Sequence, residues 1–254
     1  MNLKLFNAVK TGNLRKTAQF LAEGTEADAR NQLKETPLMY AANGGRLAIA
    51  QLLLEKGANP NTKDQGGRTP LIYAALGNSA EVAGLLLEKG AKIDDTEENG
   101  GTALIAAAFS NSVRVARLLL DKGARMDKRT EIGDNALIWA ASKDFPETAS
   151  LLIEYGAEVD AKGQDGATAL TAAAANDSYK VAGLLIEKGA DIEIRTGQGY
   201  TPLMWAVMRN SLKAAKLLVE KGANIKVRKG AGISIVQLAV SGKMKSFLKK
   251  NGAE

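Results

Sequence analysis

The chain of 254 residues contains no cysteine and no histidine. Without these two residue types, disulfide bonds, thiol catalysis, imidazole bases and zinc fingers are excluded. The opening stretch MNLKLFNAVKTGNLRK has no continuous apolar segment, and no apolar run approaches the length of a membrane span. We therefore expect no bound metal, no cofactor and no membrane span. We expect a cytoplasmic protein, or a periplasmic or secreted one if a signal peptide has been removed.

A seven-residue segment recurs every 33 residues, which is the main positive feature of the sequence. A period of this length is typical of an array of stacked units and not of one compact core. The copies are TPLMYAA at Thr36, TPLIYAA at Thr69, TALIAAA at Thr102, NALIWAA at Asn135, TALTAAA at Thr168, TPLMWAV at Thr201 and the much altered SIVQLAV at Ser234.

Each period predicts two short helices. Thr69 is suited to cap the first helix, and Pro70 fits its first position. A serine such as Ser79, or Pro146 in one copy, is expected to start the second helix. The first helix should end at a position that is occupied only by residue types that tolerate a left-handed backbone. These residues are Gly12, Gly45, Asn78, Asn111, Asp144, Asp177 and Asn210. The second should end at Gly24, Gly57, Gly90, Gly123, Gly156, Gly189 and Gly222.

A third glycine position precedes each repeated segment and predicts a tight turn with positive φ. Lys34 is its one departure. The glycines are Gly67, Gly100, Gly133, Gly166, Gly199 and Gly232.

Two helices and an extended loop repeated at 33 residues resemble the ankyrin repeat, whose signature contains T-P-L-H-x-A. The resemblance covers essentially the whole chain. It implies an all-α solenoid of stacked helix-turn-helix units with β-hairpin loops, called fingers, in a single domain over residues 1–254. The expected repeats are 31–63, 64–96, 97–129, 130–162, 163–195 and 196–228, between an N-terminal capping repeat at 1–30 and a shortened C-terminal one at 229–254.

One departure from the family pattern is systematic. The histidine of the signature is replaced in every repeat, by Met39, Ile72, Ile105, Ile138, Thr171 and Met204. If that histidine usually holds the loops by a hydrogen bond, apolar packing must replace it here.

In ankyrin proteins, partners usually bind the fingers and the first helices on the concave side. The resemblance therefore implies a non-enzymatic, monomeric module that binds another protein, and the style of the repeats suggests a bacterial one. The candidate partner-binding residues are Tyr40, Tyr73, Phe109, Trp139, Tyr200 (at a fingertip) and Trp205, with Arg68, Glu98, Glu131, Asp134, Asp165 and Arg209 around them.

Four of these aromatic residues, Tyr40, Tyr73, Trp139 and Trp205, occupy the variable x position of the signature and are here called the aromatic ladder. The chain has only 12 aromatic residues, so their recurrence at one position is informative. Binding surfaces favour Trp and Tyr, which supports a binding role. Packing in the spaces left by Ala106 and Ala172 explains the rings equally well.

The formal charge of +6 is concentrated at one end of the chain. From Thr201 onward there are 11 Lys and Arg against Glu220 and Glu254. We interpret this end as a solvated cap. The alternative is weak, salt-sensitive binding of nucleic acid or an anionic surface, without sequence specificity. The basic cluster comprises Lys226, Arg228, Lys229, Lys243, Lys245, Lys249 and Lys250. An enzyme is the least favoured class, because the chain lacks a phosphate-binding loop and a carboxylate pair that stands apart from the surface pattern.

Overall fold

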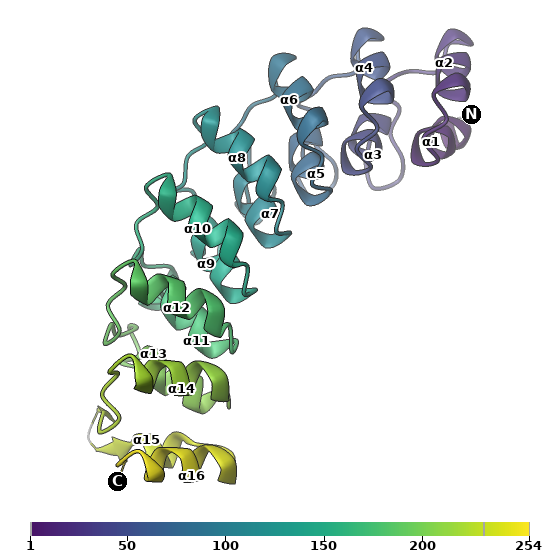
Figure 1. Ribbon diagram of the computed structural model, residues 1–254. Helices are drawn as coiled ribbons and strands as arrows, with labels where there is room; N and C mark the ends of the chain where they lie inside the picture. The colour runs from purple at the N-terminus through teal and green to yellow at the C-terminus, as the bar shows by residue number, and fades with distance from the viewer. Residues whose placement is uncertain (1, 231, 254) are drawn as a thin grey trace. The chain divides into compact units, whose positions relative to one another are not determined.

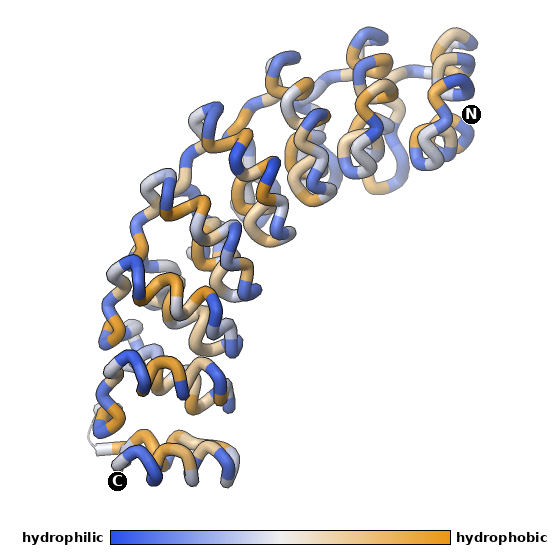
Figure 2. Tube along the Cα trace, viewed as in Figure 1, coloured by the Kyte–Doolittle hydropathy of each residue, from blue (hydrophilic) through white to orange (hydrophobic). Residues whose placement is uncertain are grey.

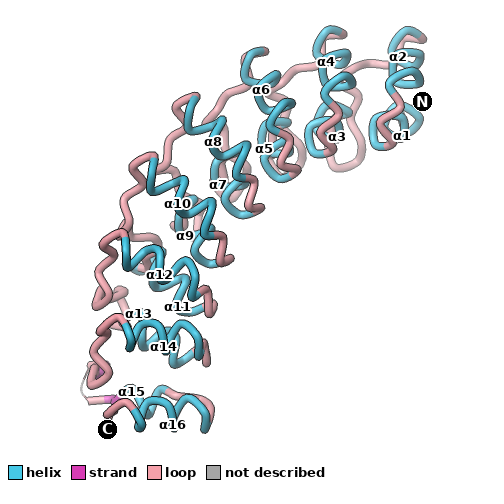
Figure 3. The backbone as a smooth tube through the Cα atoms, in the orientation of Figure 1, coloured by secondary structure: helices cyan, strands magenta, loops and turns pink. Residues whose placement is uncertain are grey.

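The computed structural model describes residues 2–230 and 232–253, with the backbone alone at Asn2 and Lys229. It consists of pairs of antiparallel helices joined by turns and longer loops (Figures 1 and 3). The chain divides into two compact units, unit 1 at Met1–Glu131 and unit 2 at Ile132–Glu254. The predicted all-α repeat fold is confirmed in both, while its organisation as one domain stays a prediction.

Unit 1 contains four helix pairs in two layers. The first helices lie side by side, and the second helices pack beside one another behind them. The first layer consists of α1 (Asn2–Lys10), α3 (Pro37–Asn43), α5 (Pro70–Leu76) and α7 (Ala103–Phe109). The second consists of α2 (Leu14–Ala22), α4 (Leu47–Glu55), α6 (Ala80–Glu88) and α8 (Val113–Asp121).

Unit 2 repeats this arrangement and ends in the shortened pair that the sequence predicts. The first layer consists of α9 (Ala136–Ser142), α11 (Ala169–Ala175), α13 (Pro202–Met208) and the four-residue α15 (Ile235–Leu238). The second consists of α10 (Pro146–Glu154), α12 (Tyr179–Glu187), α14 (Leu212–Glu220) and α16 (Gly242–Lys250). A short 3-10 helix, η1, spans Gln164–Gly166, and β1 (Arg228–Lys229) pairs antiparallel with β2 (Ile233–Ser234).

The core lies between neighbouring helices of each unit. The apolar face predicted from the repeated segment is buried, with Leu71, Ala74 and Ala75 at most 1% exposed. Hydrophobic residues accordingly run along the helices, and hydrophilic ones gather at the turns (Figure 2). Burial of this apolar surface against the next repeat is the main stabilising contribution available to so short a helix. Within residues 2–230 and 232–253, no helix is both long and apolar enough to cross a membrane.

The left-handed positions are confirmed without exception among the described residues. All seven ends of the first helices have positive φ, as do all seven glycines that end the second helices. Lys34 adopts φ 58°, so it has the same left-handed backbone as the glycines at this position in the other repeats.

The helix starts confirm the threonine caps and correct the serine caps. Thr69 and Thr102 accept the N–H of the third helical residue, 3.3 Å away in both cases. The serines before the second helices of the full repeats stand at the N-cap but do not accept such a bond. Ser178 and Ser211 instead donate to main-chain carbonyls at the end of the previous repeat's first helix, Ser142 O and Ala175 O.

The missing cap comes from the previous repeat. In unit 2, Asp144 Oδ1 accepts the N–H of Val181 at 3.0 Å, and Asp177 Oδ1 accepts that of Ala214 at 2.8 Å. Val181 and Ala214 are the third residues of α12 and α14, so the left-handed aspartate of one repeat caps the second helix of the next.

The position of the family histidine is filled as the sequence predicts, with one difference. Its six replacements are at most 5% exposed, and five of them are apolar. Thr171, however, donates to Thr168 O at 2.8 Å and accepts the Thr168 N–H at 2.7 Å. Met39 Sδ likewise accepts the Thr36 N–H at 3.3 Å, so a side-chain hydrogen bond is present at this position in two repeats and apolar side chains fill it in the other four.

A pair of glycines tests the assignment of the left-handed helix ends. Gly156 has φ 91° and Gly183 lies inside α12, yet a Cβ at either would meet no close neighbour. We expect Gly156→Ala to lower the free energy of unfolding by about 1 kcal/mol through backbone strain. Gly183→Ala should raise it by up to about 1 kcal/mol through helix propensity. Denaturant unfolding of both variants measures the difference, and equal effects would contradict the assignment.

Candidate binding surface

The aromatic ladder lies on the first helices, where the sequence places it. Tyr40 on α3 and Tyr73 on α5 belong to unit 1, while Trp139 on α9 and Trp205 on α13 belong to unit 2. All four residues are half-buried. Phe109, near the end of α7, is 42% exposed. We call the helix face that carries the ladder position, in each unit separately, the first-helix surface.

Tyr73 joins two fingers of unit 1 through its hydroxyl group. The hydroxyl lies 2.7 Å from Asp64 Oδ2 and 2.8 Å from Glu35 Oε1. A phenol has one hydrogen to donate, so the two carboxylates share it. Burial raises the pKa of Tyr73, and the hydrogen bonds to these two carboxylates raise it further. The neutral phenol is therefore the form that holds the cluster together.

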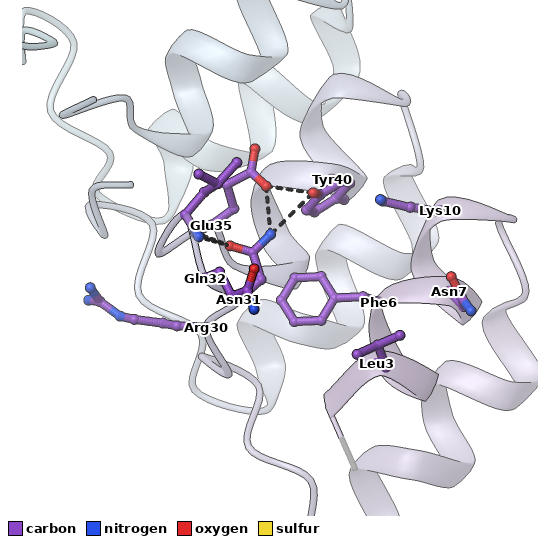
Figure 4. Close-up of a pocket in the computed structure, with 10 residues that line it drawn as sticks. Leu3, Phe6, Asn7, Lys10, Arg30, Asn31, Gln32, Glu35 and Tyr40 are labelled. Atoms are coloured by element: carbon purple, nitrogen blue, oxygen red, sulfur yellow. Dashed lines mark hydrogen bonds between the residues drawn. The ribbon is translucent and has the colours of Figure 1, made fainter. Parts of the chain in front are cut away.

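Tyr40 is held by the first finger in the same way (Figure 4). Its hydroxyl donates to Glu35 Oε2 at 2.5 Å and accepts from Asn31 Nδ2 at 3.3 Å. Its ring meets Phe6 edge-on at 5.5 Å, and Lys10 Nζ lies 4.4 Å from the ring centre. Burial and the contact with Glu35 raise the pKa of Tyr40 to about 12.

Glu35 is the centre of this network. Burial alone would raise the pKa of Glu35, but hydrogen bonds from Tyr40, Asn31 and Tyr73 and the charge of Lys10 outweigh it, so the pKa is lowered. The carboxylate is therefore ionised at neutral pH and fully engaged by donors. We call Asn31, Glu35, Tyr40, Asp64 and Tyr73 the tyrosine clamp.

The clamp fixes the fingers as well as the rings. Asn31 Oδ1 accepts the N–H groups of Leu33 and Glu35, and Asp64 Oδ1 accepts those of Gly66 and Arg68. Such turns pre-form the loop without help from a strand ladder. Each finger is thereby connected to the first-helix surface through its own aromatic residue.

In unit 2 the ladder is held by packing. The Trp205 ring lies 5.4 Å from that of Tyr200, tilted by 59°. Trp205 Nε1 is buried and has no hydrogen-bond partner among the described residues. The exposed fingertip expected for Tyr200 is wrong, because this residue is only 8% exposed and lies at the base of its finger, beside α13. Trp205 therefore packs against Tyr200 and is still partly exposed to solvent.

The six charged candidates do not form one cluster. In unit 1, Arg68 donates to Glu97 Oε2 at 2.7 Å, and this bond raises the pKa of Arg68. Glu98 and Glu131 are exposed at neighbouring fingertips. In unit 2, Asp165 and Arg209 are exposed and Asp134 is half-buried.

The sequence predicted the ladder but missed the residues that hold it. Asn31, Glu35 and Asp64 lie in the expected loops and are not among the predicted binding residues. A usable signal was present, since Asn31, Asp64 and Glu97 stand 33 residues apart and all can accept hydrogen bonds. A second set of Asp, Asn and Glu residues also recurs every 33 residues and was missed in the same way. Its members are Asp28, Asn61, Asp94, Asp127, Asp160 and Glu193.

The basic cluster at the C-terminal end is solvated. The exposed members are Lys226, Arg228, Lys243, Lys245, Lys249 and Lys250, while the side chain of Lys229 lies outside the described residues. Phe247 is the one aromatic residue interleaved among them in the sequence. These positions suit the interpretation as a solvated cap.

The described residues contain no group of three or more acidic side chains arranged to hold a metal ion. Within the clamp, Glu35 accepts from both phenols and Asp64 accepts from that of Tyr73. These bonds hold the side chains in place.

Comparison with known proteins agrees with this architecture. The chain matches a family model described as ankyrin repeats in three copies, over residues 5–97, 92–163 and 158–229. It is similar to the crystal structure of the human ASB11 ankyrin repeat domain, with 27% sequence identity and a TM-score of 0.78 over 87% of this chain and 99% of that one. Comparison with curated proteins finds no match.

Removal of one hydroxyl group tests the tyrosine clamp. We expect Tyr73→Phe to lower the free energy of unfolding by about 1–3 kcal/mol, because two partly buried carboxylates lose a donor. Tyr179→Phe is the matched control, since Tyr179 is 36% exposed on α12 and its hydroxyl forms no hydrogen bond with a described residue. Denaturant unfolding should show a loss in the first variant alone. Equal stability of the two variants would contradict the clamp.

Proposed function

This chain belongs to the ankyrin repeat family, and we propose that it is a non-enzymatic module that binds a partner protein across its fingers and first-helix surface. The observation that carries this proposal is the aromatic ladder, whose four residues are half-buried and of which Tyr40, Tyr73 and Trp205 are oriented by hydrogen bonds or ring contacts. A pre-ordered aromatic ring loses little conformational freedom on binding, which favours affinity.

The two earlier explanations of the ladder are compatible in this arrangement. The Tyr40 ring packs against Phe6 and the Trp205 ring against Tyr200, while all four ladder residues remain partly open to solvent. Tyr and Trp suit such positions because they present an apolar body with a polar edge. We propose that Tyr40 and Tyr73 in unit 1, and Trp139 and Trp205 in unit 2, are the anchors.

The charged fingertips are proposed as the polar rim of the binding surface. Glu98, Glu131 and Asp165 are exposed, as is Arg209. Rim charges act mainly on the rate of association and on the choice of partner. A partner with basic residues facing the acidic fingertips fits this distribution.

Trp205→Ala tests the anchor role against a matched control on the opposite layer. We expect this change to weaken a captured partner protein by about 2 kcal/mol, or roughly thirtyfold, the range for interface hot spots. Tyr179→Ala removes an aromatic ring from α12, where Lys213 Nζ lies 5.1 Å from the ring centre, and should leave affinity unchanged.

Stability must be measured beside affinity in this experiment. The partner is first isolated by affinity capture from the source organism, and its Kd is then measured by calorimetry. The Kd is corrected for the folded fraction from denaturant unfolding. If Trp205→Ala loses stability but keeps the affinity of the folded fraction, the ladder is packing alone and the proposal fails.

A further inference from the structure

The stack of fingers in unit 1 has an open edge at its start. Each later finger donates one main-chain N–H to the finger before it. These bonds run from Gln65 N to Leu33 O at 2.8 Å, from Glu98 N to Gly66 O at 2.9 Å and from Glu131 N to Asn99 O at 2.6 Å. Gln32 stands 33 residues before Gln65, is exposed, and donates this N–H to no acceptor among the described residues.

A hollow of about 530 Å³ lies beside this open edge (Figure 4). It is bounded by α1 on one side and by the first finger and Tyr40 on the other. Leu3 is 80% exposed and Leu33 is 56% exposed at its margin, while the Phe6 ring is buried. Gln32, whose equivalent Gln65 bonds to the preceding finger, also lines the hollow, so the hollow lies on the side of the first finger where another extended segment would pair.

The charge of the hollow is positive. Lys10 and Arg30 are both exposed and lie on either side of Phe6 in Figure 4. Neither forms an ion pair with a described residue. The carboxylate of Glu35 also borders the hollow, but Tyr40, Asn31 and Tyr73 already donate to it. The hollow thus carries two cations against one carboxylate, which Lys10 also stabilises, so its net charge is positive and much of the bordering surface is apolar.

We propose that this hollow binds an extended acidic segment of the partner protein, which pairs with the first finger as the later fingers pair with one another. A main-chain carbonyl of the segment accepts the N–H of Gln32, an apolar side chain lies between Leu3 and Leu33, and a carboxylate pairs with Arg30 or Lys10. Edge pairing of this kind gives affinity through the backbone and specificity through the side chains. This inference rests on the proposed function and names one class of segment that the module recognises.

Charge favours a different protein over a second copy of this chain. A symmetric contact between two such hollows would bring the cations Lys10 and Arg30 of one copy toward the same cations of the other. Like charges placed together at an interface oppose association. An acidic segment meets no such penalty.

The test uses a defined peptide, Glu-Leu-Asp-Gly-Leu-Glu with blocked ends, and the full chain labelled for amide NMR. We expect the peptide to shift the resonances of Gln32, Leu33 and Phe6, and to slow the hydrogen exchange of the Gln32 N–H. The basic analogue Lys-Leu-Lys-Gly-Leu-Lys should bind at least tenfold more weakly. Shifts confined to other parts of the chain, or no shifts, would overturn the proposal.

Two variants and a matched control give the test its specificity. Leu33→Asp should weaken the acidic peptide at least tenfold, and Arg30→Glu should reverse the preference toward the basic analogue. Leu47→Asp makes the same change at a leucine that is 42% exposed on α4, and should bind as the parent does. Equal loss in Leu33→Asp and Leu47→Asp would mean that net charge, and not the hollow, controls binding.

Other outcomes have defined meanings. Concentration-dependent shifts of Leu3 and Leu33 without peptide, removed by Leu33→Asp, would assign the hollow to self-association and overturn the proposal. Failure of the peptide leaves the wider proposal intact, because that is tested by Trp205→Ala in unit 2 with the captured partner. Loss of the Trp205 effect with retained peptide binding would reject the ladder and keep the hollow.

Discussion

Hydrogen bonds from one repeat to the next are the constraint on which the rest of this structure depends. A helix of seven to nine residues leaves many of its main-chain groups unpaired at its ends. Here the neighbouring repeat satisfies part of that need, as Asp177 does for Ala214 at the start of α14, and Asp28 likewise accepts the N–H of Asn59 in the next loop. Each kind of bond joins residues at its own fixed separation along the chain, so an insertion or deletion would break these bonds. This explains why the 33-residue period is kept.

The same constraint prepares the surface that we propose for binding. A main-chain hydrogen bond closes each finger, as from Asp64 N to Arg68 O, and places the loop beside its helix. The tyrosine clamp then fixes an aromatic ring between them. The rings are thus positioned before any partner arrives. At the first finger, the N–H of Gln32 bonds to no described residue and faces the side on which the hollow lies. An ordered surface and an open edge are both consequences of one stacking pattern.

The sequence predicted the backbone better than the side-chain contacts, for a physical reason. Positive φ restricts the residue type strongly, so Asn78 and Gly90 could be assigned from type and spacing alone. The caps expected from Ser178 and Ser211 are wrong because capping rules consider one helix in isolation, whereas these two serines donate to the previous repeat. The fingertip expected for Tyr200 is wrong because the fold brings its ring against that of Trp205. The clamp was missed since it joins residues up to 38 positions apart.

Amide hydrogen exchange of the finger N–H groups tests the central claim, that successive repeats are joined by main-chain bonds, most directly. The account predicts slow exchange at Gln65 and Glu98, whose N–H groups are bonded to the preceding finger, and fast exchange at Gln32, which has no such bond. All three residues are exposed, so burial of the side chain does not separate them. Fast exchange at all three positions, or slow exchange at Gln32 as well, would contradict the account.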